Sequence, residues 1–214
     1  MNRQLAYAEM KEVFRRFSAA EPHPVGELEH SSAFTLLVAV VLSAQATDAG
    51  VNRATRGLFA VAGTPERMLA LGEAGLAEHI RTIGLYRNKA KNILNLCRIL
   101  LESYGGEVPS SRAALTALPG VGRKTANVVL NTWFRHPAQA VDTHVFRVGN
   151  RTGIAPGRDE AAVERAIEDN VPVEFQLHAH HWLILHGRYI CTARRPRCAD
   201  CLIRDLCAWE EKTA

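Results

Sequence analysis

The sequence predicts an all-α fold, and three observations support this class. Apolar residues recur at helical spacing between residues 88 and 104, where Ile93, Leu96, Cys97 and Leu100 share one face. Strict alternation of apolar and polar residues, the pattern of a half-buried strand, is almost absent. The connections between the helical segments are short and carry residues that begin or end helices. With 214 residues, 47% of them hydrophobic, the chain can build one large core or two modest ones.

Several helix boundaries can be read directly from capping residues. Ser31-Ser32 can cap a helix over Ala33–Leu42, which is apolar nearly all round and is therefore expected to be central. Thr64-Pro65 combines a capping residue with proline at the first helical position. Gly105-Gly106 ends the long helix at Tyr104. Outside the central hairpin, the predicted helices cover residues 5–18, 33–42, a segment ending at 61, 65–71, 73–82, 88–104, 143–150, 159–169 and 174–189.

Charge and hydropathy exclude some classes of protein and leave others open. Twenty-six Lys and Arg residues stand against 22 Asp and Glu residues, an excess that permits a nucleic-acid partner without requiring one. The longest apolar run, Phe34–Leu42, is too short to cross a membrane, and the N-terminus lacks the apolar segment of a secretion signal. We therefore expect a cytosolic protein in which disulfides are not formed.

A glycine-rich turn between two short helices is the centre of the chain. Gly120 and Gly122 flank Val121, and glycine permits unusual backbone angles and the close approach of another chain. The amides that begin the following helix suit a phosphate oxygen, so the pattern predicts a helix-hairpin-helix that binds a DNA backbone. An ordinary helix–loop–helix remains the alternative. Five apolar residues can hold the two helices together: Leu115, Leu118, Val121, Ala126 and Leu130.

Lys124 and Asp142 are the candidate catalytic residues. Lys124 lies on the first turn of the second helix, where the helix dipole disfavours a cation and so favours the neutral amine, a nucleophile suited to Schiff-base chemistry. The alternative role for Lys124 is a simple phosphate contact. Asp142 precedes Thr143-His144-Val145 and can cap the next helix, a role that is compatible with one in catalysis.

Four cysteines near the C-terminus form a candidate metal site. Cys191, Cys198, Cys201 and Cys207 have the spacing C-x6-C-x2-C-x5-C, and four thiolates can hold either zinc or an iron–sulfur cluster. The spacing alone leaves the metal open. The six residues after Cys191 include three arginines, which predict a phosphate-binding loop rather than a merely solvated one: Arg194, Arg195 and Arg197.

Other potentially reactive residues have less specific signals. Cys97 lies on an apolar helix face, where a buried and inert thiol is expected. Four histidines cluster between residues 178 and 186 without a nearby carboxylate that completes a ligand set, so packing or surface roles are expected: His178, His180, His181 and His186.

The segment Leu118–Asn131, followed by Val141-Asp142-Thr143-His144, resembles the helix-hairpin-helix superfamily of DNA glycosylases, and within it the endonuclease III family. The similarity extends from about Ser31 to Trp209. The resemblance implies a base-excision-repair enzyme, both a DNA N-glycosidase and an abasic-site lyase. It further implies that Lys124 attacks the sugar C1′ of a damaged nucleotide while Asp142 assists.

The resemblance also implies a cofactor and DNA contacts. In similar proteins this cysteine spacing surrounds a [4Fe–4S] cluster. The segments Leu42-Ser43-Ala44-Gln45 and Ile83-Gly84-Leu85-Tyr86 match family segments that open the duplex. By resemblance, Gln45 contacts the orphaned base and Leu85 enters the base stack. The DNA contacts expected in addition to the arginine loop come from Gly120, Gly122, Arg123 and His144.

The predicted architecture is a six-helix barrel over residues 26–136 and a cluster domain of residues 1–25 and 137–214, with a central cleft. The expected enzyme removes oxidised pyrimidines, such as thymine glycol, from duplex DNA and also cleaves at abasic sites. It is expected to be a monomer, cytoplasmic and associated with a bacterial nucleoid. The alternatives are an adenine mismatch glycosylase, which in similar proteins generally lacks the hairpin lysine, and a non-catalytic DNA-binding module.

Overall fold

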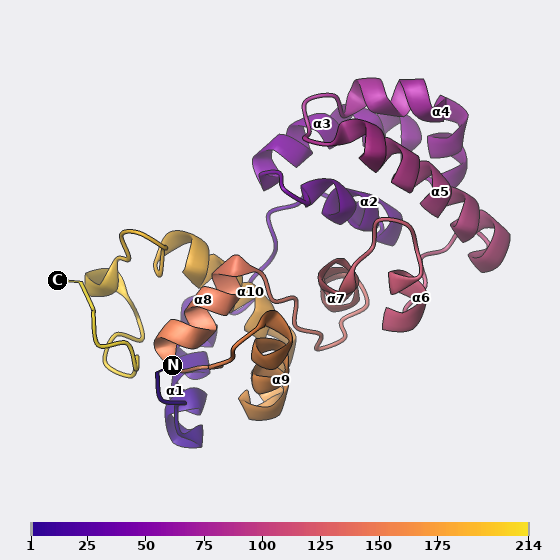
Figure 1. Cartoon of the computed structure of the whole chain (residues 1–214). Helices are drawn as coiled ribbons and strands as arrows, with labels where there is room; N and C mark the ends of the chain where they lie inside the picture. The colour runs from indigo at the N-terminus through magenta and orange to yellow at the C-terminus, as the bar shows by residue number, and fades with distance from the viewer. Residues whose placement is uncertain (1, 214) are drawn as a thin grey trace. The chain divides into compact units, whose positions relative to one another are not determined.

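The computed structural model describes residues 2–213, which are helical or irregular, with no strand among them (Figure 1). They divide into two compact units. One unit is Glu27–Phe134; the other joins the residues up to Gly26 to those from Arg135 onward. The described residues therefore confirm the all-α class. The helices are α1 Tyr7–Ala20, α2 Ala33–Ser43, α3 Asp48–Ala62, α4 Pro65–His79, α5 Tyr86–Tyr104, α6 Arg112–Thr116, α7 Arg123–Thr132, α8 Thr143–Thr152, α9 Glu160–Asn170, η1 Val173–Phe175, α10 Gln176–Tyr189 and η2 Cys198–Asp200.

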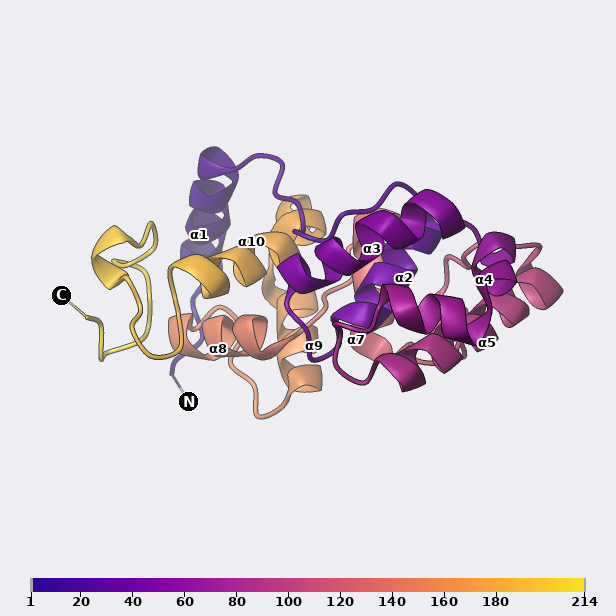
Figure 2. The ribbon, with the colours of Figure 1, turned by 90° about the horizontal axis from the view of Figure 1, so that it is seen from above.

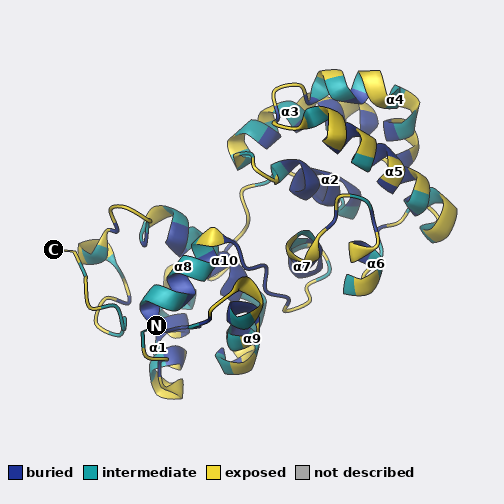
Figure 3. Ribbon diagram, viewed as in Figure 1, coloured by how far each residue is buried: buried dark blue, intermediate teal, exposed yellow. Residues whose placement is uncertain are grey.

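Helix α2 is the centre of the Glu27–Phe134 unit. Every residue from Phe34 to Leu42 is buried, as the continuous dark-blue ribbon in Figure 3 shows. The helix contacts α3, α5 and α7, so neighbours cover it on several sides. Ser32 caps its first turn by accepting a hydrogen bond from the Thr35 amide. The prediction of a central, nearly all-apolar helix with a serine cap is confirmed.

The α4–α5 region differs in detail from the sequence prediction. Thr64 caps α4 and Pro65 is its first residue, as expected, but the two predicted helices form one element with a break at Gly72, where φ is +67°. The second half ends at His79 rather than near residue 82, and α5 begins at Tyr86, two residues earlier than predicted. Gly105 ends α5 in the left-handed conformation. Six residues thus form the turn between the helices.

The second unit packs α1, α8, α9 and α10 around an aromatic core, and Figure 2 shows α8 and α10 from a second direction. Phe14 is fully buried and stacks on Phe175, with ring centroids 6.0 Å apart. The Trp182 indole donates a hydrogen bond of 2.9 Å to the Glu21 carbonyl. This bond fixes the segment after α1 to α10.

None of the helices in residues 2–213 has the length and apolar character required to span a membrane.

Candidate active site and metal centre

The hairpin between α6 and α7 has the geometry that its glycines predict. Gly120 has φ +79°, and a Cβ at this position would approach the Asn92 side chain on α5 to 3.2 Å. Both the backbone angle and the close packing against α5 therefore require glycine. The five apolar residues predicted to hold the hairpin together are all buried: Leu115, Leu118, Val121, Ala126 and Leu130.

Gly122 differs from Gly120 because nothing in the fold explains its small size. Its φ is −88°, and no atom lies within 4 Å of the position that a Cβ would take. Gly122 is the N-cap of α7, and the first amides of a helix have no acceptor within the helix. The open space in front of this helix end suits the close approach of an anion such as a phosphate.

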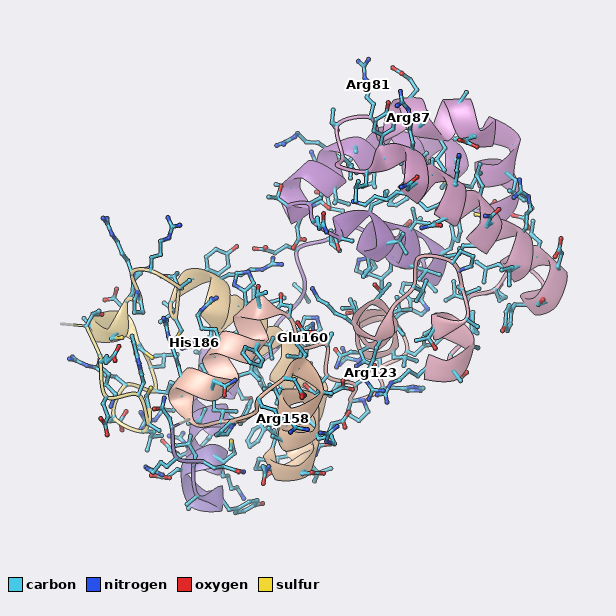
Figure 4. All side chains as sticks on the ribbon, viewed as in Figure 1. Arg81, Arg87, Arg123, Arg158, Glu160 and His186 are labelled. Carbon is cyan, nitrogen blue, oxygen red and sulfur yellow. The ribbon has the colours of Figure 1, made fainter. Side chains whose placement is uncertain are left out.

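Lys124 is the second residue of α7 and is exposed, as is Arg123 beside it, which is labelled in Figure 4. The structure therefore places Lys124 at the helix N-terminus, open to solvent and not buried. One turn further along, the buried Asn127 accepts a hydrogen bond of 2.8 Å from Arg112 Nε on α6. This bond fixes α7 against α6 and so fixes the base of the lysine.

Asp142 is the N-cap of α8, which confirms that part of the prediction. Its Oδ1 accepts hydrogen bonds of 2.9 Å from the His144 amide and 2.8 Å from the Val145 amide. The side chain is buried, and the two amides hold its carboxylate in one orientation. On the next turn of α8, Arg147 Nη2 lies 3.2 Å from Nδ1 of the half-buried His144.

Gln45 and Leu85 share an uncommon backbone conformation. Their φ angles are +56° and +59°, and the only other non-glycine residue with positive φ in residues 2–213 is Arg135. Gln45 is exposed, and 61% of Leu85 is exposed although leucine is normally buried. Figure 4 labels Arg81 and Arg87, which lie on either side of the Leu85 turn. The two loops thus present an amide and an apolar side chain to solvent in strained conformations.

All four cysteines of the tail line one pocket. Burial, with smaller contributions from the neighbouring thiols Cys207, Cys191 and Cys198, raises the pKa of Cys201 to about 11. A thiolate there is unfavourable unless a cation is also present, which is the condition that a metal centre supplies. Within residues 2–213 no three potential ligands are close enough to hold a single metal ion. The four cysteines therefore meet at one pocket without forming a site for a single ion.

Two further side chains place nitrogen atoms within 4 Å of cysteine sulfur atoms, and the sequence analysis assigned neither of them to this site. His186, labelled in Figure 4, places Nε2 3.7 Å from Cys201 Sγ. Arg151 Nη1 lies 3.9 Å from Cys191 Sγ and also donates to the Thr192 carbonyl at 2.7 Å. Arg147 and Arg151 are four residues apart and so share a face of α8, but this spacing does not show that the face contacts the loop after Cys191.

The loop after Cys191 is held by α8 and exposes its arginines. Arg147 donates to the Cys191 carbonyl at 2.9 Å, and Arg151 to the Ala193 carbonyl at 2.8 Å. Three arginines of this loop are exposed: Arg194, Arg195 and Arg197. Arg197 forms an ion pair of 2.8 Å with Asp200, so Arg194 and Arg195 are better placed to attract an anion.

The remaining thiol is buried, as are three of the four histidines between residues 178 and 186, while His178 is half-buried. Cys97 is fully buried, and burial raises the pKa of its thiol to about 12, which confirms an inert cysteine. Burial lowers the pKa of His181 to about 4 and also lowers that of His178. Both rings are therefore largely neutral near pH 7.

Two family models match the chain. Residues 38–173 match the HhH-GPD superfamily of base excision DNA repair proteins, a range that contains the hairpin, Lys124 and Asp142. Residues 191–207 match the iron–sulfur binding domain of endonuclease III, and these limits are the first and last of the four cysteines.

Similar proteins and structures cover almost the entire chain. The endonuclease III of Escherichia coli (strain K12) is 59% identical over 205 residues, covering 96% of this chain and 97% of the relative. The endonuclease III of Haemophilus influenzae is 58% identical, covering 94% and 95%. A solved endonuclease III–DNA covalent intermediate matches with a TM-score of 0.88 and 45% identity, covering 95% and 96%. A thermostable thymine-DNA glycosylase matches with a TM-score of 0.81 and 26% identity, covering 96% and 98%.

Proposed function

The chain belongs to the endonuclease III family of base-excision-repair DNA glycosylases with AP lyase activity, and on this basis we propose that Lys124 and Asp142 carry out its chemistry. The observation that supports this most directly is the position of Lys124. It is the second residue of the helix that follows the Gly120 and Gly122 turn, where a DNA phosphate can approach. A sugar adjoining that phosphate is within the reach of a lysine side chain.

The proposed reaction begins at the sugar C1′ of the damaged nucleotide. The neutral Lys124 amine forms a bond to C1′, the glycosidic C1′–N bond breaks, and the base leaves. Loss of the amine proton and opening of the sugar ring give an imine between Lys124 and C1′. A proton then leaves C2′, and the bond from C3′ to its phosphate oxygen breaks by β-elimination. The strand is thereby cleaved 3′ to the abasic sugar.

Asp142 is proposed as the partner of the lysine. Its carboxylate accepts the proton that the amine loses and stabilises the positive charge that develops at C1′. The two α8 amides that donate to Oδ1 fix the direction of the carboxylate. Lys124 and Asp142 belong to different units, so the proposal requires both units to present these side chains to one extruded nucleotide.

The proposed substrate is duplex DNA that contains an oxidised pyrimidine, such as thymine glycol, or an abasic site. Gln45 contacts the orphaned base, and Leu85 enters the stack where the extruded nucleotide was. Both side chains are exposed at strained turns, which is consistent with contact to a ligand rather than to the core. Phosphate contacts come from the hairpin and the arginine loop, with Arg123 and His144 beside the two catalytic residues.

The cofactor of this enzyme is a [4Fe–4S] cluster. Its proposed ligands are the four cysteines that line one pocket: Cys191, Cys198, Cys201 and Cys207. When bound, the cluster supplies four iron–thiolate bonds that tie the two ends of the arginine loop together. The residues of the chain then hold that loop against α8 through Arg147 and Arg151.

The residue borders of the two functional domains, the monomeric state and the location are further parts of the proposal. The barrel domain corresponds to residues 26–136 and the cluster domain to the remainder. A monomer suffices because one chain carries the hairpin, both catalytic residues and the cluster ligands. The expected location is the bacterial nucleoid in the cytoplasm, where the substrate is found.

The test is covalent trapping. Borohydride reduces an imine to a stable amine, so the native protein is expected to become linked to a duplex that contains thymine glycol or an abasic site. Lys124→Ala is expected to abolish this adduct, whereas Lys91→Ala, at an exposed lysine near Glu73, is the matched control. Trapping of Lys124→Ala at the native rate would exclude Lys124 as the nucleophile.

A panel of substrates distinguishes the proposed lesion class from the rivals. Duplexes with thymine glycol, with adenine opposite a damaged guanine and with an abasic site are assayed separately for base release and strand cleavage. The proposal expects base release and cleavage from thymine glycol and no release of adenine. Adenine release without cleavage supports the mismatch enzyme, and binding alone supports a non-catalytic module.

A further inference from the structure

Lys89 is a buried lysine that the proposed chemistry does not use. It lies on α5, and only 6% of the residue is exposed. Lysine is almost never buried to this extent unless its ammonium group is paired. Burial lowers the pKa of Lys89 because the ammonium group loses its contact with water. Hydrogen bonds to protein atoms are therefore needed to stabilise the charged form.

The Lys89 side chain binds the end of another helix. Its Nζ donates hydrogen bonds of 2.9 Å to the Leu42 carbonyl and 2.6 Å to the Ala44 carbonyl. Ala44 is the C-cap of α2, and the last carbonyls of a helix have no donor within the helix. A cation at this end is also favoured by the helix dipole. Lys89 therefore fixes the backbone immediately before Gln45.

The Lys89 backbone is bonded to the other loop. Its amide donates a hydrogen bond of 3.1 Å to the carbonyl of Leu85, which is the N-cap of α5 and has the left-handed conformation. This is the first i→i−4 bond of α5, so the Lys89 side chain ties the helical turn that follows Leu85 to the segment immediately before Gln45. All of these residues belong to the Glu27–Phe134 unit.

We propose that Lys89 is a positioning residue that holds the Gln45 loop and the Leu85 turn in a fixed arrangement for opening the duplex. This inference rests on the proposed DNA contacts of Gln45 and Leu85. Strained backbone at Gln45 and Leu85 persists only where the surrounding structure determines it. The Lys89 side chain supplies this restraint by joining the end of α2, before Gln45, to the first turn of α5, after Leu85. Insertion of Leu85 and contact of Gln45 with the orphaned base then occur at a fixed separation.

A first experiment compares substrates that do and do not need duplex opening. Lys89→Met keeps an unbranched apolar side chain of similar length but removes the ammonium group, and with it the hydrogen bonds to the Leu42 and Ala44 carbonyls. Lys91→Met on the same helix is the matched control. Borohydride trapping is measured on an abasic site in a duplex and on the same strand alone. Lys89→Met is expected to slow duplex trapping by about tenfold and single-strand trapping by less than about twofold. Equal losses on the two substrates overturn the proposal.

A second experiment leaves the buried lysine intact, which covers the case in which Lys89→Met does not fold. Gln45→Ala, Leu85→Ala and the double variant change only exposed side chains. Because the loops act together, the double variant is expected to lose less duplex activity than the product of the single losses, by at least about threefold. A loss equal to that product overturns the proposal.

The two experiments also separate this inference from the proposed function. Single-strand trapping by the native protein depends on Lys124 and not on duplex opening. Absence of trapping by the native protein would contradict the proposed chemistry. Native trapping together with equal losses for Lys89→Met on both substrates contradicts the role of Lys89 alone.

Discussion

Asp142 Oδ1 lies 2.8 Å from the backbone nitrogen of Val145, so the carboxylate assigned to catalysis also caps α8. The two roles can be separated by substitution. Asparagine caps a helix about as well as aspartate, so Asp142→Asn is expected to change the free energy of unfolding by less than about 0.5 kcal/mol. Base excision is expected to fall by roughly 10²- to 10⁴-fold, because the amide cannot accept the lysine proton.

Asp142→Ala is the comparison for the capping role. It removes both the cap and the carboxylate, so it is expected to lose about 1 kcal/mol of stability as well as the activity. Chemical unfolding measures the first effect, and single-turnover base release measures the second. Full activity in Asp142→Asn would show that Asp142 only caps α8.

The two hairpin glycines make a matched pair for a second prediction. Gly120→Ala places a Cβ 3.2 Å from Asn92 at φ +79°, so a loss of about 1–2 kcal/mol in unfolding free energy is expected. Gly122→Ala meets no atom and has an ordinary φ, so its stability is expected to be unchanged. Its DNA affinity is nevertheless expected to fall, because the methyl group occupies the space in front of α7.

Thermal unfolding and equilibrium binding to an abasic-site duplex measure the two effects. Native affinity in Gly122→Ala would mean that no phosphate approaches this helix end. Unchanged stability in Gly120→Ala would mean that the contact with Asn92 relaxes without cost.

The helices were largely predictable because their signals are local. Ser32 and Thr64 begin helices, Gly105 ends one, and the apolar run in α2 is buried as expected. The sequence predicted two helices where the structure has one element with a break at Gly72. Two short segments with helical periodicity have the same sequence pattern whether they form separate helices or one kinked helix. Lys124 and Asp142 could be named from residue type and position, whereas Lys89 and Arg151 could not. Their roles depend on carbonyls 45 and 41 positions away in the chain, which no local pattern encodes.

Arg151 is expected to stabilise the cluster through the loop that carries its first ligand. The guanidinium binds two loop carbonyls and also stacks on Trp209, with its central carbon 4.4 Å from the ring centroid. Removing such support around a metal centre typically weakens metal binding by 10- to 100-fold. Arg151→Met is therefore expected to lose iron to a chelator roughly tenfold faster than the native protein. The decay of cluster absorbance measures this rate.

Arg158→Met is the control for Arg151→Met. Arg158 is exposed and forms an ion pair with the neighbouring Asp159, at 3.3 Å. Its substitution is expected to leave the rate of iron loss unchanged. Equal rates in the Arg151 variant and the native protein would mean that the four thiolates hold the cluster without this support.

The arginine loop predicts a specific dependence of DNA binding on salt. Each arginine that neutralises a phosphate adds roughly 0.9 to the slope of log affinity against log salt concentration. Arg194→Ala and Arg195→Ala are each expected to reduce the slope by about 1, without altering the preference among lesions. Arg197→Ala is expected to have a smaller effect because Asp200 already pairs with Arg197. Unchanged slopes in the first two variants would show that the loop does not contact DNA.

The buried His181 ring is expected to make the free energy of unfolding of its unit depend on pH. Burial lowers its pKa from 6.5 to about 4, with smaller contributions from His178 and Arg135. Between these two values the unfolded chain binds a proton that the folded chain does not, so stability falls as the pH is lowered from 6.5 towards 4. The shift corresponds to at most about 3 kcal/mol across this window, and no further loss from this group is expected below it.

His181→Gln removes the titrating ring and is expected to flatten this part of the pH profile. His30→Gln, at an exposed histidine, is the control. The measurement is the urea midpoint of each protein at several pH values from 4 to 7, with the difference between the native protein and the variant isolating the contribution of His181. A difference that stays constant over this range would mean that the His181 ring is protonated equally in the folded and unfolded states. The fold would then have to admit water or a partner to Nδ1, which in the structure is buried without a hydrogen bond.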